Sequence, residues 1–189
     1  MKMNLSKLNQ RGWGWTRLFL AVAIGGMVMM VANSAFAQSE EGIKAAFVYN
    51  FAKFTEWPAN AFADGGAPIT VGFVGAASLA DTFEKNVVGK NANGRDFAVK
   101  RLPTAAGTES CQIVFVGDPG QIEAVVSAIK GKAILTVGDS DHFAAAGGMI
   151  KFVKDGAKIS FDLDFTSINA AQLKLDAKLR QIARSVKGG

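Results

Sequence analysis

Three short apolar runs constrain the fold of this chain more than any other feature. They are residues 69–74, 113–116 and 133–137, and each carries apolar side chains at both odd and even positions. A strand of this kind is buried on both faces, which is typical of the interior of a parallel sheet. The runs therefore predict three central strands of one sheet.

Helical periodicity surrounds these runs. Apolar residues recur at helical spacing in residues 40–54, 78–87, 118–130 and 167–186. Local start signals agree, because Ser39 and Ser78 are expected N-caps and Asp118 followed by Pro119 is typical of a helix start. Residues 96–101 alternate apolar and polar side chains, which predicts a half-buried strand.

The pattern changes near the end of the chain. Residues 148–153 and 157–163 alternate as two strands, and the Asp155-Gly156 pair between them is a strong hairpin signal. Alternation of strands and helices followed by a hairpin predicts an α/β fold. We expect a mainly parallel sheet with an antiparallel edge hairpin and helices on both faces.

Residues 1–37 have the three parts of a cleavable secretory signal. A basic start without acidic residues precedes an apolar run over residues 18–31, and Ala35 and Ala37 supply small residues before the expected cut. The alternative is an uncleaved membrane anchor, because residues 18–37 are nearly long enough to span a bilayer. We expect a Sec-type signal peptide over 1–37 and a single periplasmic domain over 38–189.

Removal of the signal changes the charge of the protein. The whole chain carries a net charge of +5, but four of its 21 Lys and Arg and none of its 16 Asp and Glu lie in residues 1–37. The mature chain keeps 17 basic against 16 acidic residues, a net charge of +1. The basic character of the full sequence thus comes from targeting, and no nucleic-acid surface is expected.

The mature chain offers few groups for metal or cofactor chemistry. It has one cysteine, Cys111, and one histidine, His142, which exclude an intrachain disulfide and a zinc site built from Cys and His. Neither a dinucleotide-binding glycine motif nor a Walker lysine is present, so no cofactor is expected. Cys111 enters a predicted buried strand, where it is a small buried hydrophobe or, alternatively, a free or intermolecular thiol.

A polar loop follows the third central strand. Asp139, Ser140 and His142 are the residue types of a hydrolase, but catalytic groups must converge from different parts of a fold and Ser140 has no nucleophile-elbow sequence around it. We therefore do not expect an enzyme. Open α/β sheets often bind ligands at the carboxyl ends of their strands, so ligand binding and ordinary helix capping both remain as interpretations of this loop.

The most unusual segment is aromatic. Residues 47–58 hold a stripe whose simplest role is to pack the core, while Phe54, Trp57 and Pro58 at the helix exit can also form an apolar contact surface. The expected contacts for a partner or ligand are therefore Phe54, Trp57 and Pro58, together with Asp139 and Phe143 of the polar loop.

Three blocks resemble the YfiR family of periplasmic proteins. They are residues 44–58 (KAAFVYNFAKFTEWP), residues 134–140 continuing to 147–152 (ILTVGDS and GGMIKF), and residues 159–163 (ISFDL). The resemblance covers residues 43–186. It implies a compact α/β fold that can dimerise and a regulatory role, in which the protein inhibits a membrane-bound diguanylate cyclase by contacting its periplasmic sensor region. It also implies that an OmpA-like outer-membrane lipoprotein can sequester the repressor.

One feature departs from the family pattern. The resemblance implies cysteine pairs, and Cys111 matches one member, but the position expected to hold its partner, on the strand around Gly72, has no thiol. An intramolecular disulfide switch is thus excluded, and only an intermolecular bond through Cys111 is left. Two other hypotheses compete with the inhibitory regulator of cyclic di-GMP synthesis and biofilm. They are a periplasmic small-molecule sensor and an exported hydrolase that uses Ser140, His142 or Asp139.

Overall fold

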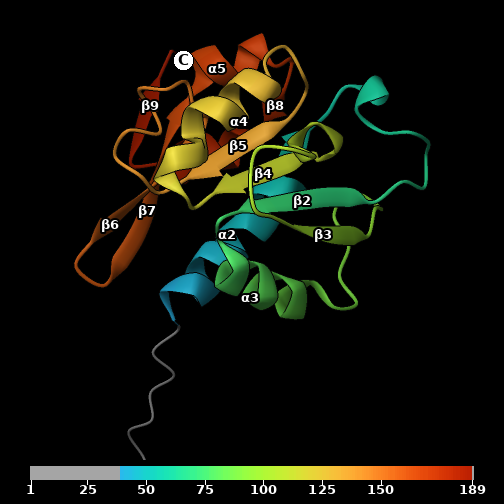
Figure 1. Cartoon of the computed structure of the whole chain (residues 1–189), viewed down its shortest axis with the longest axis horizontal. Helices are drawn as coiled ribbons and strands as arrows, with labels where there is room; N and C mark the ends of the chain where they lie inside the picture. Colours follow the sequence, from blue (N-terminus) through green and yellow to red (C-terminus); the bar gives the residue numbers. More distant parts are fainter. Residues whose placement is uncertain (1–38, 189) are drawn as a thin grey trace, which may run out of the picture. The chain divides into compact units, whose positions relative to one another are not determined.

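A seven-stranded sheet organises residues 39–188, the part of the chain that this computed structural model describes (Figure 1). The expected signal peptide and its cleavage site lie outside the described residues. The strand order is β3-β2-β4-β5-β6-β7-β9. The strands are β2 Ile69–Val74, β3 Phe97–Leu102, β4 Ile113–Val116, β5 Leu135–Gly138, β6 Ile150–Asp155, β7 Lys158–Asp164 and β9 Ser185–Lys187.

The direction of the strands agrees with the sequence patterns. The five strands from β3 to β6 run parallel, and β7 is antiparallel to β6 across a turn in which Gly156 has a φ of 57°. A two-stranded antiparallel sheet joins β1 (Thr55–Glu56) to β8 (Lys174–Leu175). The predicted α/β class, with a mainly parallel sheet and an antiparallel hairpin, is confirmed.

Helices cover both faces of the sheet. The helices are α2 Glu40–Lys53, α3 Ala77–Val87, α4 Ile122–Ala128, α5 Phe165–Ala170 and α6 Ala177–Ile182, with short 3-10 turns at η1 Ala59–Ala61, η2 Thr108–Ser110 and η3 Pro119–Gln121. Helices α2 and α3 share one buried cluster with Phe73 and Phe115, whereas α4 packs against Val114 and Val116, whose side chains point to the other face. None of the helices in residues 39–188 is both long and apolar enough to cross a membrane.

Helix α2 buries a different set of residues from the one that its periodicity predicts, which is Ile43, Ala46, Phe47, Asn50, Phe51 and Phe54. Its buried residues are Lys44, Ala45, Val48, Phe51 and Ala52, and Phe47 is only half-buried. The helix packs against α3 as well as against the sheet, and it therefore buries a second side that consists of small residues. Small side chains carry little signal in a hydrophobic pattern, which explains the offset.

The predicted N-cap of α3 is wrong. The helix begins at Ala77, and its cap position is Ala76 without a side-chain hydrogen bond, so Ser78 lies inside the first turn. Gly75, with a φ of 65°, reverses the chain directly after β2. The turn takes so few residues that the helix begins earlier than the nearest capping side chain suggested.

The long helix predicted over residues 167–186 is also wrong. Helix α5 ends near Gln172, whose φ is 57°, and α6 begins after Asp176, whose side chain accepts a hydrogen bond from the backbone N–H of Lys178 (2.8 Å). The chain then becomes extended, and the N–H of Arg184 donates to the carbonyl of Phe161 on β7 (2.8 Å). Strand β9 thus pairs with the exposed side of β7, and the hairpin does not form the edge of the sheet.

Cys111 faces the position that the family resemblance indicated. Its side chain is buried, burial raises the pKa of its thiol, and a Cβ added at Gly72 would lie 2.8 Å from its Sγ and 3.7 Å from its Cβ. Disulfides join Cβ atoms that are about 3.5–4.5 Å apart. Position 72 can therefore accept the second half of a disulfide, although it holds glycine.

The first prediction concerns Gly72→Cys. Under mild oxidation the variant should form a bond to Cys111, seen as the loss of two hydrogens by mass spectrometry, and its free energy of unfolding should rise by about 2–4 kcal/mol. The matched control is Gly72→Ala, which should destabilise the protein because its methyl group overlaps the Cys111 thiol. A cysteine at position 72 that stays reduced in folded protein would contradict the strand geometry.

Candidate functional site

The expected contact residues lie at the two ends of helix α2. Phe54, Trp57 and Pro58 follow its C-terminal end, whereas Asp139 lies beside its first turns through an ion pair with Lys44 (2.7 Å). Ten residues of helix separate Lys44 from Phe54, a rise of about 15 Å. The structure therefore divides the predicted site into two surfaces joined by one helix.

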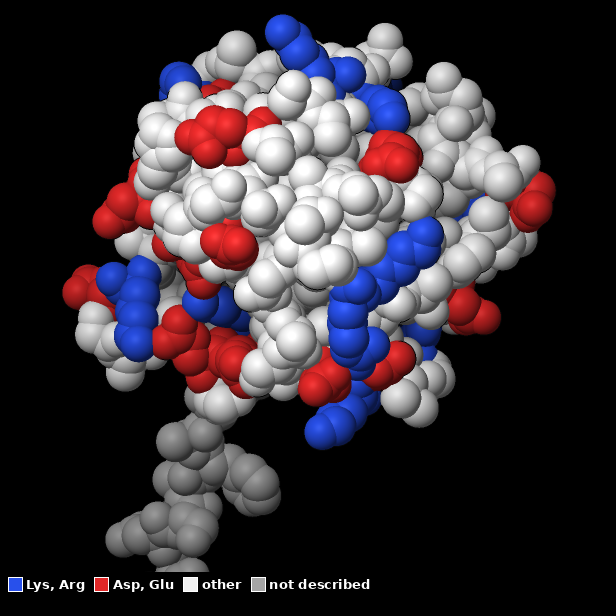
Figure 2. Space-filling model, in the orientation of Figure 1, with Lys and Arg blue, Asp and Glu red and all other residues white. Residues whose placement is uncertain are grey.

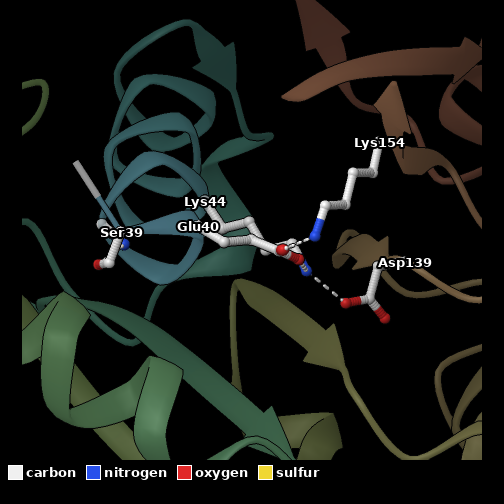
Figure 3. A network of polar contacts seen from close by, with 6 residues as sticks. Ser39, Glu40, Lys44, Asp139 and Lys154 are labelled. Carbon is white, nitrogen blue, oxygen red and sulfur yellow. Dashed lines mark hydrogen bonds and ion pairs between the residues drawn. The ribbon is translucent and has the colours of Figure 1, made fainter. Parts of the chain in front are cut away.

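The surface at the start of α2 is a network of four charged side chains (Figure 3). The ammonium group of Lys44 donates to Asp139 Oδ2 and lies 2.7 Å from Glu40 Oε1. The second oxygen of Glu40 accepts from Lys154 Nζ at 2.6 Å. The network thereby ties α2 to the loop after β5 and to strand β6.

Local sequence prepares the helix end for this arrangement. The hydroxyl of Ser39 accepts a hydrogen bond from the N–H of Gly42 (3.0 Å), which confirms Ser39 as the N-cap. Glu40 occupies the first turn, where a negative charge opposes the positive end of the helix dipole. Lys44 follows four residues later, so that the two side chains lie on one face of the helix.

Burial and charge act against each other at Lys44. Its side chain is 11% exposed, and burial by itself disfavours the ammonium form. Hydrogen bonds to Asp139 and Glu40 outweigh that effect, so that the pKa of Lys44 is raised. Hydrogen bonds from Lys154 and Lys44 lower the pKa of Glu40 to about 2. Lys44 and Glu40 therefore both stay charged at neutral pH.

Side chains of the loop after β5 diverge to three elements. Asp139 reaches α2, Asp141 pairs with Lys151 on β6 (2.8 Å), and His142 Nε2 lies 2.7 Å from Glu123 on α4. The hydroxyl of Ser140 accepts only from the nearby N–H of His142. Asp139, Ser140 and His142 thus do not form the relay that nucleophilic catalysis needs. Within residues 39–188 no group of three or more His, Cys, Asp and Glu gathers to hold a metal ion.

The buried side chain of Phe143 holds this loop in place. Its side chain is fully buried, and its ring lies so close to Gly138 and Gly148 that a Cβ at either glycine would overlap it. The ring therefore holds the loop against the ends of β5 and β6 and offers no exposed surface to a partner. Asp139 and Phe143 are the two expected contact residues in this loop. A partner can reach only Asp139, whose side chain is 35% exposed.

The surface at the other end of α2 is aromatic. Phe54 is half-buried, with the ammonium groups of Lys53 and Lys178 at 5.8 and 5.5 Å from the ring centroid. Trp57 packs edge-to-face on Phe62 with 6.1 Å between ring centroids, and its indole nitrogen is buried without a hydrogen-bond partner among the described residues. An unpaired buried donor costs about 1–3 kcal/mol. Pro58 is half-buried and starts the segment that leads to β2.

The usual ligand crevice of this strand order is closed. In open sheets ligands bind where the strand order reverses, here between the carboxyl ends of β2 and β4. A Cβ added at Gly75 would lie 2.5 Å from the Cβ of Asp118, so the loops after these two strands pack directly on each other. A hollow of about 580 Å³ lies instead at the opposite strand ends, beside Phe62, Cys111 and Lys132.

Sequence reasoning missed Lys44 and this hollow. The Glu40 and Lys44 spacing was visible as a helical ion pair, but such pairs are common on solvated faces. Only the fold shows that Lys44 is buried against Asp139, 95 residues away.

The second prediction is that Lys44→Met lowers the free energy of unfolding by about 1–3 kcal/mol. Methionine keeps the apolar part of the side chain but leaves the carboxylates of Asp139 and Glu40 without their buried partner. Urea unfolding measures the change. The control, Lys151→Met, removes a pair with the fully exposed Asp141 and should therefore cost less than Lys44→Met. Equal losses would show that burial adds nothing to the Lys44 pairs.

The third prediction follows from the lowered pKa of Glu40. A carboxylate whose pKa falls on folding stabilises the protein above its unfolded pKa of 4.5, and this stabilisation disappears as the pH falls toward about 2. Lys154→Met removes the largest cause of that shift. Between pH 4.5 and 2 its unfolding free energy should therefore depend less steeply on pH than that of the wild type. Parallel curves from urea titrations would contradict the assignment.

Comparisons with known proteins identify the family to which this chain belongs. One solved structure with a similar chain course is a conserved domain protein from Vibrio cholerae O1 biovar El Tor strain N16961, with 11% identity and a TM-score of 0.46. The match covers 63% of this chain and 55% of that one, so this chain spans about half the length of that protein. The search of curated proteins returned no match. Residues 41–184 match the family described as YfiR/HmsC-like. This range includes helix α2 from its second residue onward and the loop that holds Asp139. The chain therefore belongs to the YfiR/HmsC-like family.

Proposed function

We propose that the mature chain is a periplasmic inhibitor that binds the periplasmic sensor region of a membrane-bound diguanylate cyclase and so controls cyclic di-GMP synthesis. Membership of a regulatory family over residues 41–184 is the observation that carries this proposal. The geometry is compatible with it, because Asp139 and His142 of the loop after β5 pair with Lys44 and Glu123 rather than with each other.

The two ends of α2 supply surfaces for such a partner. The first family-like block runs along α2 to Pro58, and the second begins at β5 and contains Asp139. The ion pair between Lys44 and Asp139 joins the two blocks. A partner that contacts either end of α2 would thus act on an element tied to both. Phe54 is the aromatic anchor we assign to that contact, together with Trp57 and Pro58.

Two further partners belong to the proposal. An OmpA-like outer-membrane lipoprotein would compete for the inhibitor and so release cyclase activity and biofilm formation. A second copy of the chain would form a homodimer.

A small-molecule sensor is the second candidate function. The hollow of about 580 Å³ beside Phe62 is of the size that ligand sites commonly have, and its wall includes the amides of Asn60, Gln112 and Gln172. A ligand that binds the folded state must raise its melting temperature, so a thermal-shift screen of periplasmic metabolites tests this function. A screen without a stabilising compound would count against it.

The fourth prediction tests the regulatory function. Mature protein used as bait on solubilised membranes should recover a protein with a cytoplasmic cyclase domain, identified by mass spectrometry, and deletion of the gene should raise cyclic di-GMP. Phe54→Ala should weaken binding of the recovered protein at least about tenfold, because truncation of a central aromatic anchor costs more than about 1.4 kcal/mol.

The matched control for this experiment is Val88→Ala. Val88 is 77% exposed, follows α3 directly and is not one of the expected contact residues. This variant should bind like the wild type, and circular dichroism should show that both variants fold. Failure of folded bait to recover a cyclase, with cyclic di-GMP unchanged in the deletion strain, would reject the proposed function.

A further inference from the structure

Strand β7 has an outer edge that is only half covered. Strand β9 pairs with Asp162–Asp164, and within residues 39–188 no strand lies on that side of residues 158–161. Figure 1 shows the hairpin of β6 and β7 projecting beyond the neighbouring strands of the sheet. An uncovered strand edge presents free backbone groups, so it is a template for pairing with another chain.

The register of the hairpin decides which backbone groups are free. The N–H of Asp164 donates to the carbonyl of Met149 on the β6 side (2.8 Å), and bonded residues alternate along an antiparallel pair. Ile159 and Phe161 therefore turn their backbone groups away from β6. The carbonyl of Phe161 confirms this, because it accepts from the N–H of Arg184 on the outer side (2.8 Å). The outward N–H and C=O of Ile159 have no strand partner.

A hollow of about 690 Å³ lies against this edge. It is bounded by β7, by α2 and by the end of α6, and its apolar wall contains Phe47, Ile159, Phe161 and Ile182. The side chain of Ile182 is 60% exposed, and the half-buried ring of Phe47 packs on Phe161 with 5.4 Å between centroids. Free backbone groups beside apolar side chains are the two features by which a sheet edge binds an extended peptide.

Two of the three basic residues around the hollow are already paired. Lys154 Nζ donates to Glu40 (2.6 Å), and Arg184 Nε donates to Asp162 (2.8 Å). Lys154 belongs to the charge network at the start of α2, so the hollow continues the surface that we assign to a partner at that end of the helix.

The third basic residue, Lys158, determines the charge of a fitting occupant. Lys158 lines the hollow, is exposed and has no ion pair among residues 39–188. The one acidic residue in the wall, Asp155, acts on Arg184, whose pKa is raised first by Asp162 and also by the charge of Asp155. An acidic residue on the occupant therefore complements Lys158.

The opposite edge of the sheet is less suited to strand addition. Strand β3 carries the charged residues Lys100 and Arg101 side by side, and Arg101 pairs with Glu84 of α3 (2.7 Å). Charged side chains on an edge strand disfavour pairing with another chain. The open part of β7 has apolar side chains in place of such charges.

We propose that the open edge of β7 binds an extended segment of the protein partner, which adds as a further strand in the hollow between β7 and α6. The backbone of this segment pairs with Ile159, its apolar side chains contact Phe47 and Ile182, and an acidic residue meets Lys158. This inference rests on the regulatory function proposed above and specifies the chemistry of the segment that the protein recognises.

A model peptide tests the backbone pairing directly. The probe is the capped hexapeptide ETVTVE, which is extended, apolar on one face and acidic at both ends. At saturating peptide, hydrogen exchange of the Ile159 amide in mature protein, followed by NMR, should slow at least about tenfold, because the amide gains an acceptor. The control is the same peptide with every internal backbone nitrogen methylated, which cannot donate to β7 and should bind much more weakly. An Ile159 amide that ETVTVE does not protect would overturn the site.

A charge swap tests the role of Lys158. Lys158→Glu should weaken binding of ETVTVE at least about threefold and favour the basic peptide KTVTVK, because the sign of the contact is reversed. Lys130→Glu makes an equal change of charge at an exposed residue outside the hollow and should alter neither affinity. Equal responses of the two variants would show that Lys158 makes no specific contact.

A variant of the apolar wall tests the site in the cell. Ile182→Ser removes an apolar side chain that is already 60% exposed, so the urea midpoint should stay close to that of the wild type while cyclic di-GMP rises toward the level of the deletion strain. Val88→Ser is the matched control, because it removes an apolar side chain that is 77% exposed and does not line the hollow. That strain should keep the wild-type level.

Failure of the site and failure of the function give different results. If deletion of the gene raises cyclic di-GMP but Ile182→Ser and Lys158→Glu do not, the β7 edge is not the contact and the regulatory function stands. If deletion itself changes nothing, the function and the partner segment are both rejected. A dimeric protein whose Ile159 amide is protected without peptide would show that a second copy covers the edge, which also overturns the proposal.

Discussion

The ion pair between Lys44 and Asp139 fixes how the first helix meets the sheet. Helix α2 brings Phe47 and Phe51 onto Phe152 and Phe161 of the hairpin, with ring centroids 5.0 to 5.8 Å apart. Apolar contacts of this kind tolerate sliding and rotation, because dispersion and burial are not directional. A buried ammonium group has no such freedom, because it must keep its acceptors. The charge network therefore sets the position of the helix that the aromatic core stabilises.

This arrangement gives α2 a second role as the link between two surfaces. Its first turn is held by Asp139 and Lys154, and its last residues lead through β1 into the segment that carries Trp57 and Phe62. Figure 2 shows one face of the molecule, on which positive and negative side chains are interspersed without a large area of one sign. This face therefore carries no extended field of one sign, and residues 38–189 together carry a net charge of only +1.

Locally encoded features of the fold could be predicted, and those set by distant groups could not. The strand over Ile69–Val74, the N-cap Ser39 and the turn at Gly156 depend on residues within a few positions of one another. The last predicted helix failed because the carbonyl of Phe161 and the strand of Thr55 capture its backbone. Lys44 was missed because its acceptor is 95 residues away. Phe143 looked exposed in its polar loop because only the fold places Gly138 and Gly148 around its ring.

The pairing of Cys111 with Gly72 limits how this protein can respond to a stimulus. The two positions face each other on neighbouring segments, so a second thiol would lock β2 to the entry of β4. With glycine there, the thiol packs as an apolar group, and its raised pKa keeps it protonated and unreactive. Any change of state must then be carried by non-covalent contacts. The segment that holds Phe62 lies between two hollows and is held by hydrogen bonds from Arg95 and Gln112 to backbone carbonyls. Such bonds can exchange with a ligand or partner at small net cost, whereas a disulfide cannot.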